Sequence, residues 1–192
     1  LRTELGELGE FTLIEHLTKD FEIKNPSTIK GVGDDAAVIN NSNKHTVIST
    51  DMLIEGIDFD MTYTPLRHLG YKAVAINLSD IAAMNATPKQ ITVNIAVSNR
   101  YSVEALSELY AGIYLACQRY DVDLIGGDTS SSPTGMYISI TAIGEVEPEK
   151  EVYRSGANIH DLVCVSGDLG SAYSGLLILQ REKATFKANP NY

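Results

Sequence analysis

The chain has 192 residues, of which 44% are hydrophobic and 21% charged, and it carries a formal net charge of −10. This is the composition of an ordinary globular protein and excludes a wholly disordered one. The negative charge excludes a protein that binds along the phosphate backbone of a nucleic acid. No apolar run approaches the roughly 20 residues that span a membrane. No leader sequence is recognisable, so we expect a cytoplasmic protein, and its charge favours one that holds anionic substrates through metal ions.

Early in the chain, a T-x-x-E capping pattern from Thr12 to Glu15 predicts a short amphipathic helix. An acidic pair, Asp34 and Asp35, then follows two glycines and precedes the apolar residues 36–39. The glycines allow a tight backbone path and the close approach of a ligand. Residues 40–44 are polar and predict a hairpin turn.

The returning strand of this hairpin is predicted over residues 46–50, where β-branched residues gather. Ser49, Thr50 and Asp51 would therefore lie at the end of that strand. Consecutive hydroxyl and carboxylate oxygens suit a hard cation such as Mg²⁺. The same residue types are also ordinary turn formers, so a plain polar strand end is an equal alternative at this point.

The strongest helix signal begins at Thr64-Pro65, a hydroxylic cap followed by proline in the first turn. The apolar spacing predicts a helix that runs to about Met84. Asn77 and Asp80 are three residues apart and share one face of this helix. Polar side chains aligned in so apolar a stretch indicate a site, although a helix face near solvent would also explain them.

Further elements follow in the middle of the chain, each defined by strict alternation or by helical spacing. They are a strand over 91–97, a helix from its cap at Ser102 to about Tyr120, a short strand over 122–125 that ends in Gly126-Gly127-Asp128-Thr129, and a strand over 136–146. The order of elements predicts an α+β domain with helices packed on a mainly antiparallel sheet.

The alternating apolar pattern of the strand over 136–146 ends just before Pro148, and we expect a domain boundary there. Residues 1–148 would form the first domain, and residues 149–192 the beginning of a second α/β domain. In this second part we predict a strand over 162–165 and a helix over 172–180. One strand and one helix are too little to bury a core of their own.

Histidine and cysteine spacing gives no catalytic or metal-binding pattern, and neither a P-loop nor a Ser-His-Asp arrangement is present. The histidines, all of which we expect at the surface, are His16, His45, His68 and His160. Cys117 and Cys164 are expected to be small buried side chains in a reducing compartment.

Acidic residues instead recur beside small or hydroxylic neighbours, at Asp34-Asp35, Asp51, Asp80 and Asp128. Carboxylates that repel one another are reasonable in one cleft when divalent metal ions neutralise them. The sequence therefore predicts an acidic metal site assembled from several elements.

Five motifs resemble those of the thiamine-monophosphate kinase family, in the family's order and spacing. They are Gly33-Asp34-Asp35-Ala36-Ala37, S-T-D-M-L-I-E-G over 49–56, N-L-S-D-I-A-A-M over 77–84, Gly126-Gly127-Asp128-Thr129 and Arg154-Ser155-Gly156-Ala157. The resemblance covers essentially the whole chain. The wider superfamily includes aminoimidazole ribonucleotide synthetase, selenophosphate synthetase and a hydrogenase maturation protein. The combination of N-L-S-D-I-A-A-M over 77–84 with Gly126-Gly127-Asp128-Thr129 points to the kinase branch.

The resemblance implies the N-terminal domain of the aminoimidazole ribonucleotide synthetase-like fold, and transfer of phosphate from ATP to thiamine monophosphate. The Mg²⁺ ligands that it implies are Asp35, Ser49, Thr50, Asp51, Asp80 and Asp128. The ATP contacts that it implies are Gly127, Asp128, Arg154 and Tyr110. It also implies a homodimer in which two N-terminal sheets close across a two-fold axis. Phosphoryl transfer depends on positioning and charge neutralisation, which clustered Mg²⁺ ions supply.

Two departures from the family's pattern bear on the substrate site. The family commonly has E-G-x-H-F, whereas this chain has Asp58 in place of the histidine. A carboxylate cannot donate to a phosphate as a protonated imidazole does, which weakens the substrate contact implied for Asp58. Family members are also longer, and their later substrate residues would lie beyond Tyr192.

Three alternatives stay open from the sequence. One is another ATP-dependent synthetase of the same superfamily with a different acceptor. A second is a non-catalytic module that binds Mg-nucleotide, and a third is a two-metal phosphohydrolase, although such enzymes usually add histidine ligands. Release of ADP that depends on thiamine monophosphate, and not on other acceptors, would separate the kinase from all three.

Overall fold

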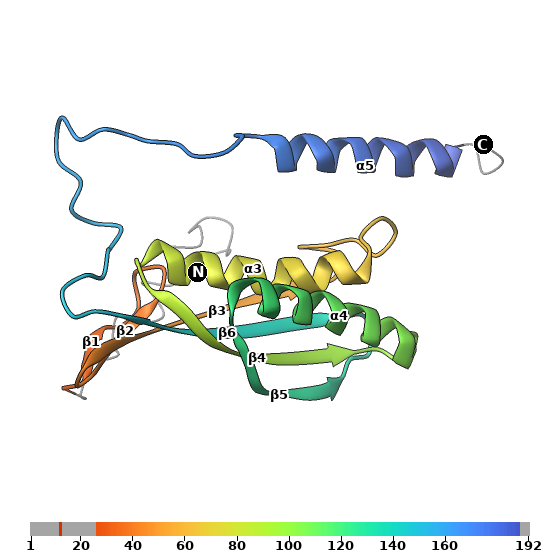
Figure 1. Cartoon of the computed structure of the whole chain (residues 1–192). Coiled ribbons are helices and arrows are strands. Elements are labelled where there is room, and N and C mark those ends of the chain that lie inside the picture. Colours follow the sequence, from red (N-terminus) through yellow and green to blue (C-terminus); the bar gives the residue numbers. More distant parts are fainter. Residues whose placement is uncertain (1–11, 13–25, 189–192) are drawn as a thin grey trace, which may run out of the picture.

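In the computed structural model, which describes residue 12 and residues 26–188, one sheet carries long helices on one of its faces (Figure 1). The strands are β1 (Thr28–Lys30), β2 (Ala37–Asn41), β3 (Lys44–Ile54), β4 (Thr87–Val97), β5 (Asp123–Ser131) and β6 (Tyr137–Val146). The helices are α3 (Leu66–Ala83), α4 (Val103–Tyr120) and α5 (Ser171–Ala188). Apart from Thr12, the short helix predicted at 12–15 lies outside the described residues.

The strand order in the sheet is β1-β2-β3-β6-β4-β5. Every described pairing is antiparallel except β4 with β5, which are parallel and are joined through α4. A parallel pair requires such a crossover, because a tight hairpin can join only antiparallel strands. The predicted α+β fold with a mainly antiparallel sheet is therefore confirmed.

The core lies between the helices and one face of the sheet. Strand residues alternate between the two faces, so every second side chain of β4 and β6 is buried beneath α3 and α4. The largest fully buried side chains are Leu69, Ile81, Met84, Ile91, Leu109, Ile113, Met136, Ile138 and Ile140. The opposite face of the sheet carries no helix among the described residues (Figure 1).

Both long helices of the domain agree with their predicted bounds, but they begin differently. At α4, the Ser102 side chain accepts a hydrogen bond from the Ala105 backbone N–H at 3.2 Å, so the predicted cap is confirmed. At α3, the residue in the cap position is Pro65 instead of Thr64, and it makes no side-chain cap. Proline fixes an extended entry into the helix without needing a hydroxyl.

Two strands extend further than predicted. β3 continues through Asp51 to Ile54, because its residues pair with β6 throughout that length. β5 likewise includes residues 126–129, which pair with β4. The polar and glycine residues that indicated strand ends are thus held inside strands, since the neighbouring backbone supplies a continuous row of hydrogen bonds.

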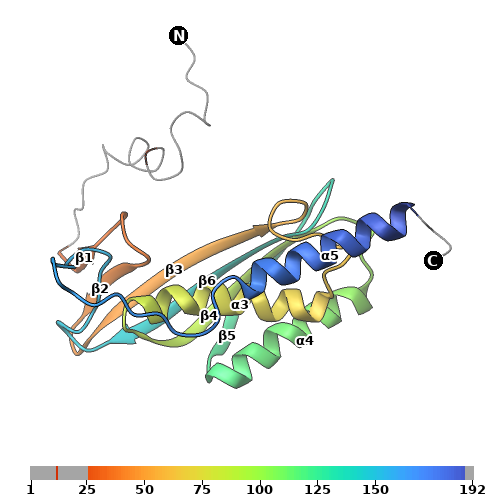
Figure 2. The same cartoon turned by 90° about the horizontal axis from the view of Figure 1, so that it is seen from above.

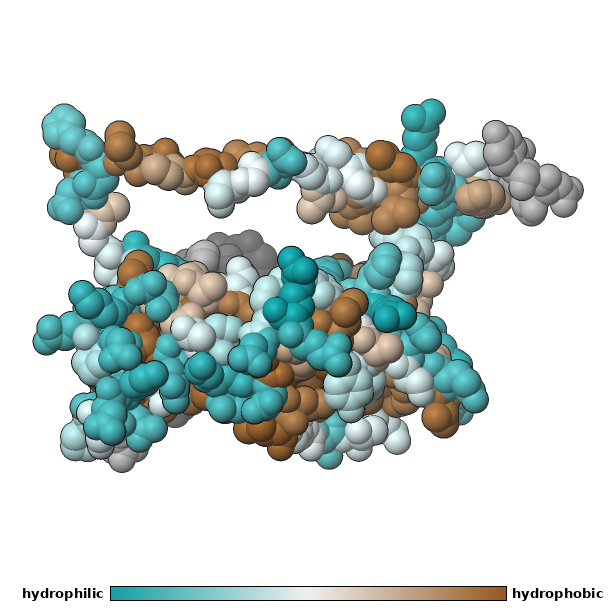
Figure 3. Space-filling model, in the orientation of Figure 1, coloured by the Kyte–Doolittle hydropathy of each residue, from teal (hydrophilic) through white to brown (hydrophobic). Residues whose placement is uncertain are grey.

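The chain after β6 departs most from the predictions. Residues 162–165 form no strand, and Leu162 and Val163 are 90% and 96% exposed. No strand in the described part of the chain lies beside them to share backbone hydrogen bonds. The predicted helix over 172–180 is present as the longer α5, which buries no residue. Figure 3 shows apolar side chains lying exposed along residues 159–188, which we call the outlying segment. The domain boundary at residue 148 stays a prediction.

The two cysteines differ in environment. Cys117 is buried on α4 as predicted, and burial raises the pKa of its thiol. Cys164 is exposed, so its predicted burial is wrong; it lies in the segment that has no partner strand. None of the described helices combines the length and the apolar character needed to cross a bilayer.

Candidate metal and nucleotide site

The predicted acidic site forms where β2 stops covering the edge of β3. The pairing of β2 with β3 ends at Ala37 and Ile48, so later residues of β3 have an open backbone edge. The Asn77 side chain of α3 fills part of this edge by accepting the Asp51 backbone N–H at 3.0 Å. The Asn77 amide also donates to the Ala73 carbonyl at 2.9 Å, which fixes its orientation.

Ser49 joins three elements at this edge. Its buried hydroxyl lies 2.7 Å from Oδ2 of Asp80 on α3 and 3.2 Å from the carbonyl oxygen of Asp35 in the loop before β2. A hydroxyl has one proton to donate, so the shorter contact to the Asp80 carboxylate is the stronger bond. The structure therefore brings together four of the predicted metal residues: Asp35, Ser49, Asp51 and Asp80.

The carboxylates of this group repel one another. The pKa of Asp51 is raised, first by burial and then by the charges of Asp80 and Asp58. This is the electrostatic condition in which a bound cation is stabilising, because it relieves both the repulsion and the lost hydration. Oxygen is the donor throughout, as Mg²⁺ requires.

Asp35 is also held by an arginine that lies 119 residues further along the chain. The Arg154 Nε donates to Oδ1 of Asp35 at 2.8 Å, and its Nη2 bonds the same oxygen. The Arg154 backbone N–H donates to Oδ1 of Asp34 at 3.3 Å. The predicted nucleotide contact Arg154 thus lies against a predicted metal ligand.

Thr50 and Asp128 lie elsewhere. Thr50 points to the sheet face opposite the helices, where its hydroxyl donates to the Ile140 carbonyl at 3.1 Å. Asp128 is exposed on β5 and pairs in register with Asn94. Neighbouring residues of a strand point to opposite faces, so Thr50 cannot share a face with Ser49 and Asp51.

The remaining predicted site residues have separate surroundings. Tyr110 lies on α4 in a shallow hollow with Tyr114, and Figure 2 shows α4 on the side of α3 away from β3. Gly127 has a φ of 153°, and a Cβ there would lie 1.8 Å from the Val93 carbonyl oxygen, so β5 requires glycine to pair with β4. The Asp58 carboxylate accepts the Ile54 backbone N–H at 2.7 Å and stabilises the turn after β3.

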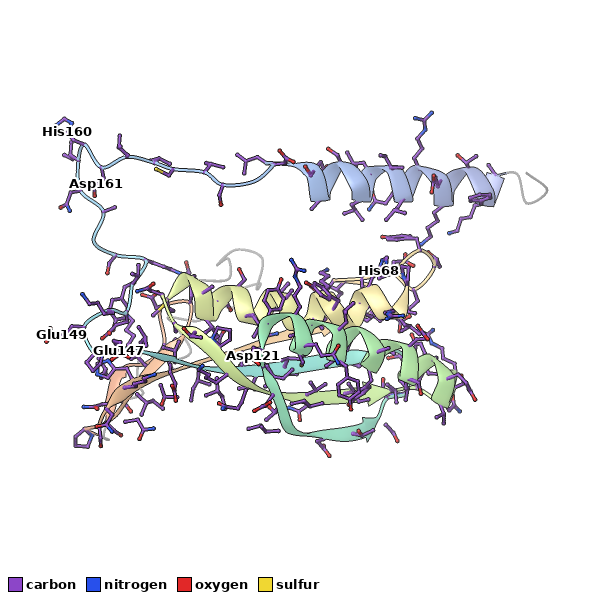
Figure 4. All side chains as sticks on the ribbon, in the orientation of Figure 1. His68, Asp121, Glu147, Glu149, His160 and Asp161 are labelled. Atoms are coloured by element: carbon purple, nitrogen blue, oxygen red, sulfur yellow. The ribbon has the colours of Figure 1, made fainter. Side chains whose placement is uncertain are left out.

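The predicted surface location is wrong for His45. It is buried at the start of β3, with Nδ1 3.1 Å from Oε1 of Glu151. His68 and His160 are exposed as predicted, and His160 projects from the outlying segment in Figure 4. His16 lies outside the described residues. Nothing local marks His45 for burial, because its partner is 106 residues away.

The oxygen donors fit a hard cation whose remaining ligands are supplied by substrate or water. Within residues 26–188, no three Asp, Glu, His or Cys side chains converge closely enough to hold a metal by themselves. Mg²⁺ is commonly bound by one or two carboxylates together with phosphate oxygens and waters. Asp51, Asp80 and the Ser49 hydroxyl match that pattern.

The fold and its acidic edge define an α+β domain with helices on one face of a mainly antiparallel sheet and oxygen donors gathered beside its central strand β3. Residues 33–146 match the family described as AIR synthase related protein, N-terminal domain, and the chain belongs to that family.

Relatives place the chain more narrowly. It is 37% identical to the thiamine-monophosphate kinase of Bacillus subtilis, over 91% of this chain and 54% of that protein. It is 40% identical to the enzyme of the same name from Buchnera aphidicola of Schizaphis graminum, over 95% and 55%. Among solved structures, "AaThiL complexed with AMPPCP and TMP" has a TM-score of 0.84 at 33% identity, covering 95% of this chain and 56% of that one. The chain spans about half the length of these relatives.

Proposed function

We propose that this chain is part of an enzyme that phosphorylates thiamine monophosphate with ATP, giving thiamine diphosphate and ADP. The observation that carries this proposal is the similarity, over nearly the whole chain, to proteins named thiamine-monophosphate kinase. The similar structure with AMPPCP and TMP supports it, since AMPPCP is an analogue of ATP and TMP corresponds to the acceptor. Because ATP is the donor, we place the enzyme in the cytoplasm.

Mg²⁺ would be held on the helix side of β3. Asp51 and Asp80 supply charge, and Ser49 orients the Asp80 carboxylate. Asn77 holds the Asp51 backbone and so sets where its carboxylate lies. Bound Mg²⁺ would neutralise phosphate charge, and an acceptor that is already ionised needs no strong general base. Asp35 would add a further carboxylate from the loop before β2.

For the nucleotide and substrate, we keep Arg154, Gly127, Asp128 and Tyr110 as proposed ATP contacts. Arg154 has the strongest support from geometry, because its guanidinium lies beside the acidic group and can bond a phosphate by two parallel N–H donors. Asp58 is kept as a position near the acceptor only through family likeness. Its carboxylate is already used in the turn after β3.

The test is acceptor-dependent release of ADP by the intact enzyme that contains this chain. We expect ADP to form in proportion to thiamine diphosphate when ATP, Mg²⁺ and thiamine monophosphate are all present. A synthetase of the same family would instead release ADP with another acceptor. Free phosphate without any acceptor would indicate a hydrolase, and nucleotide binding without turnover would indicate a binding module.

We also propose a homodimer through the sheet face that carries no helix. Met52 on that face is 58% exposed, and Thr50 and Asp128 would be brought toward the second copy. Closed two-fold dimers are the commonest oligomers, and a second sheet would cover this face. We expect light scattering to give twice the chain mass, and Met52→Glu to give a monomer. Ile159→Glu adds the same charge to the outlying segment and should leave the dimer intact; a monomeric parent chain would contradict the dimer.

A further inference from the structure

A cavity of about 250 Å³ lies at the end of the sheet where β3 begins and β6 ends. The charged residues that line it are Lys44, Lys89, Lys150, Glu145 and Glu147. Glu149 follows Glu147 in the turn after β6 but is not part of the lining (Figure 4). Lys44 precedes Asp51 by seven residues, which is roughly 20 Å along an extended strand, so this cavity is separate from the proposed metal site.

Lys89 reaches the cavity because β4 is irregular at its start. The buried side chains of Ile91 and Val93 alternate with open ones, and strict alternation would turn Lys89 to the same buried face. The pairing with β6 shifts between Pro88 and Gln90, and Lys89 has no partner residue there. Such bulges re-aim a side chain and are frequent next to active sites. The irregularity thus brings an ammonium group into the wall of the cavity instead of the core.

The three lysines of the cavity differ in their partners. Lys44 Nζ lies 3.3 Å from Oε2 of Glu145 and 3.8 Å from Oε1 of Glu147, so both glutamates are paired with this one lysine. Lys89 and Lys150 have no carboxylate partner within residues 26–188. Two ammonium groups that line one small cavity repel each other, and a bound anion would relieve that repulsion.

Uncharged donors lie beside these lysines. The Asn85 amide donates one hydrogen to the Lys150 carbonyl at 2.8 Å, and an amide has a second N–H to offer. Thr87 adds a hydroxyl to the lining. The Val152 N–H donates to the Met84 carbonyl at 3.2 Å and holds the chain after Lys150 against the end of α3. The backbone of Lys150 is therefore already ordered, which lowers the entropic cost of binding an anion there.

We propose that this cavity binds a phosphate group between Lys89 and Lys150, as inorganic phosphate or as a small phosphate monoester. A phosphate monoester carries a charge of about −1.5 to −2 at neutral pH, which two lysines match, and three oxygens that accept hydrogen bonds. Lysine binds phosphate as a point charge and needs no planar fork. The volume is below the roughly 300–1,000 Å³ of sites for larger ligands, so a whole nucleotide does not fit.

This inference goes beyond the proposed function, because no step of that reaction uses the cavity. The experiment titrates the full chain with inorganic phosphate at constant ionic strength, without Mg²⁺ or nucleotide, and follows the NMR shifts of backbone amides. We expect saturable shifts at residues 85–89 and 147–150, with a dissociation constant on the order of millimolar. Glycerol 3-phosphate should shift the same amides, and the tighter of the two ligands identifies the form that the site takes. Acetate, which carries a single charge, should bind at least about fivefold more weakly.

Charge-removing variants locate the site. Lys89→Gln and Lys150→Gln each remove one ammonium group and should weaken phosphate binding roughly three- to tenfold. Glu147→Gln removes a repelling charge from the rim and should strengthen binding about twofold. The matched control is Lys187→Gln on α5, which removes the same charge outside the cavity and should leave phosphate affinity unchanged. Circular dichroism melting checks that each variant is folded.

The outcomes separate this site from the proposed function. Parent-like phosphate affinity in both lysine variants would overturn the site, as would equal binding of acetate or the absence of shifts at tens of millimolar phosphate. Asp51→Asn should bind phosphate as the parent does, since the titration contains no metal. Failure of the ADP-release assay would therefore leave the cavity standing, and failure of the phosphate titration would leave the proposed kinase standing.

Discussion

Replacing Gly112 by alanine is expected to destabilise the domain by roughly 3 kcal/mol or more. A Cβ on Gly112 would lie 1.9 Å from the Arg67 carbonyl oxygen, which is main chain and cannot turn aside. The contact is reciprocal, since a Cβ on Gly70 would lie 2.0 Å from the Leu109 carbonyl oxygen. The two helices α3 and α4 therefore touch through their backbones, and a methyl group must push them apart across the core.

Thermal melting of the full chain measures this effect, and we expect the midpoint to fall by roughly 10 °C. The matched control is Gly175→Ala on α5, where a Cβ would meet nothing within 4 Å. Alanine favours a helix over glycine by about 0.5–1 kcal/mol, so the control should be neutral or slightly stabilising. A Gly112→Ala midpoint within about 2 °C of the parent would show that α3 and α4 can separate at little cost.

Elements whose pattern is local could be predicted from the sequence. α4 was defined by its Ser102 cap and its apolar spacing, and β4 and β6 by alternation of buried and open residues. Each of these signals arises within the element itself. By contrast, the lengths of β3 and β5 are set by neighbouring strands, and the Asp and Gly residues within them carry the opposite local preference.

Contacts between distant segments could not be predicted. The burial of His45 depends on Glu151, and the position of Arg154 depends on Asp35, in both cases across more than 100 residues. The strand predicted at 162–165 fails for a related reason. A strand is stabilised by hydrogen bonds to a neighbour, and an apolar run alone does not supply that neighbour.

The candidate site was predicted in part. Helical spacing correctly put Asn77 and Asp80 on one face of α3, and both now meet β3. The prediction that Thr50 and Asp51 act side by side placed the two residues at the end of a strand. Once they belong to a strand, alternation sends them to opposite faces, so in a single copy Thr50 stays apart from the acidic group.

Asp51→Asn is expected to weaken Mg²⁺-dependent nucleotide binding by at least about tenfold while leaving the fold intact. The carboxylate lies beside Asp80, and the two charges together favour the binding of a divalent cation. Phosphate oxygens would complete the coordination of that cation. An amide keeps the shape of the side chain and removes the charge. The backbone bond from Asp51 N–H to Asn77 does not involve the side chain, so β3 should stay in place. Asp80→Asn should act in the same direction, with some added cost because it changes the partner of Ser49.

The pH dependence of the stability of the cation-free protein is a second, independent test of the Asp51 carboxylate. Burial, Asp80 and Asp58 raise the pKa of Asp51 above 3.8, so the folded chain holds this proton more tightly than the unfolded chain does. Stability from this group is therefore present at low pH and is lost as pH rises through the raised folded value. An amide at this position cannot ionise, so the melting midpoint of Asp51→Asn relative to the parent should increase as pH rises above about 4 and level off near neutrality.

Calorimetry with ATP, with and without Mg²⁺, measures the binding to Asp51→Asn, and melting from pH 3 to 8 measures its stability. Asp121→Asn is the control, because it removes an equal charge at the end of α4, where φ is 54° and asparagine is well tolerated. Unchanged ATP affinity in Asp51→Asn would remove Asp51 from the metal site. A midpoint difference that does not vary with pH would show that the Asp51 carboxylate is not under the repulsion inferred from its burial beside Asp80.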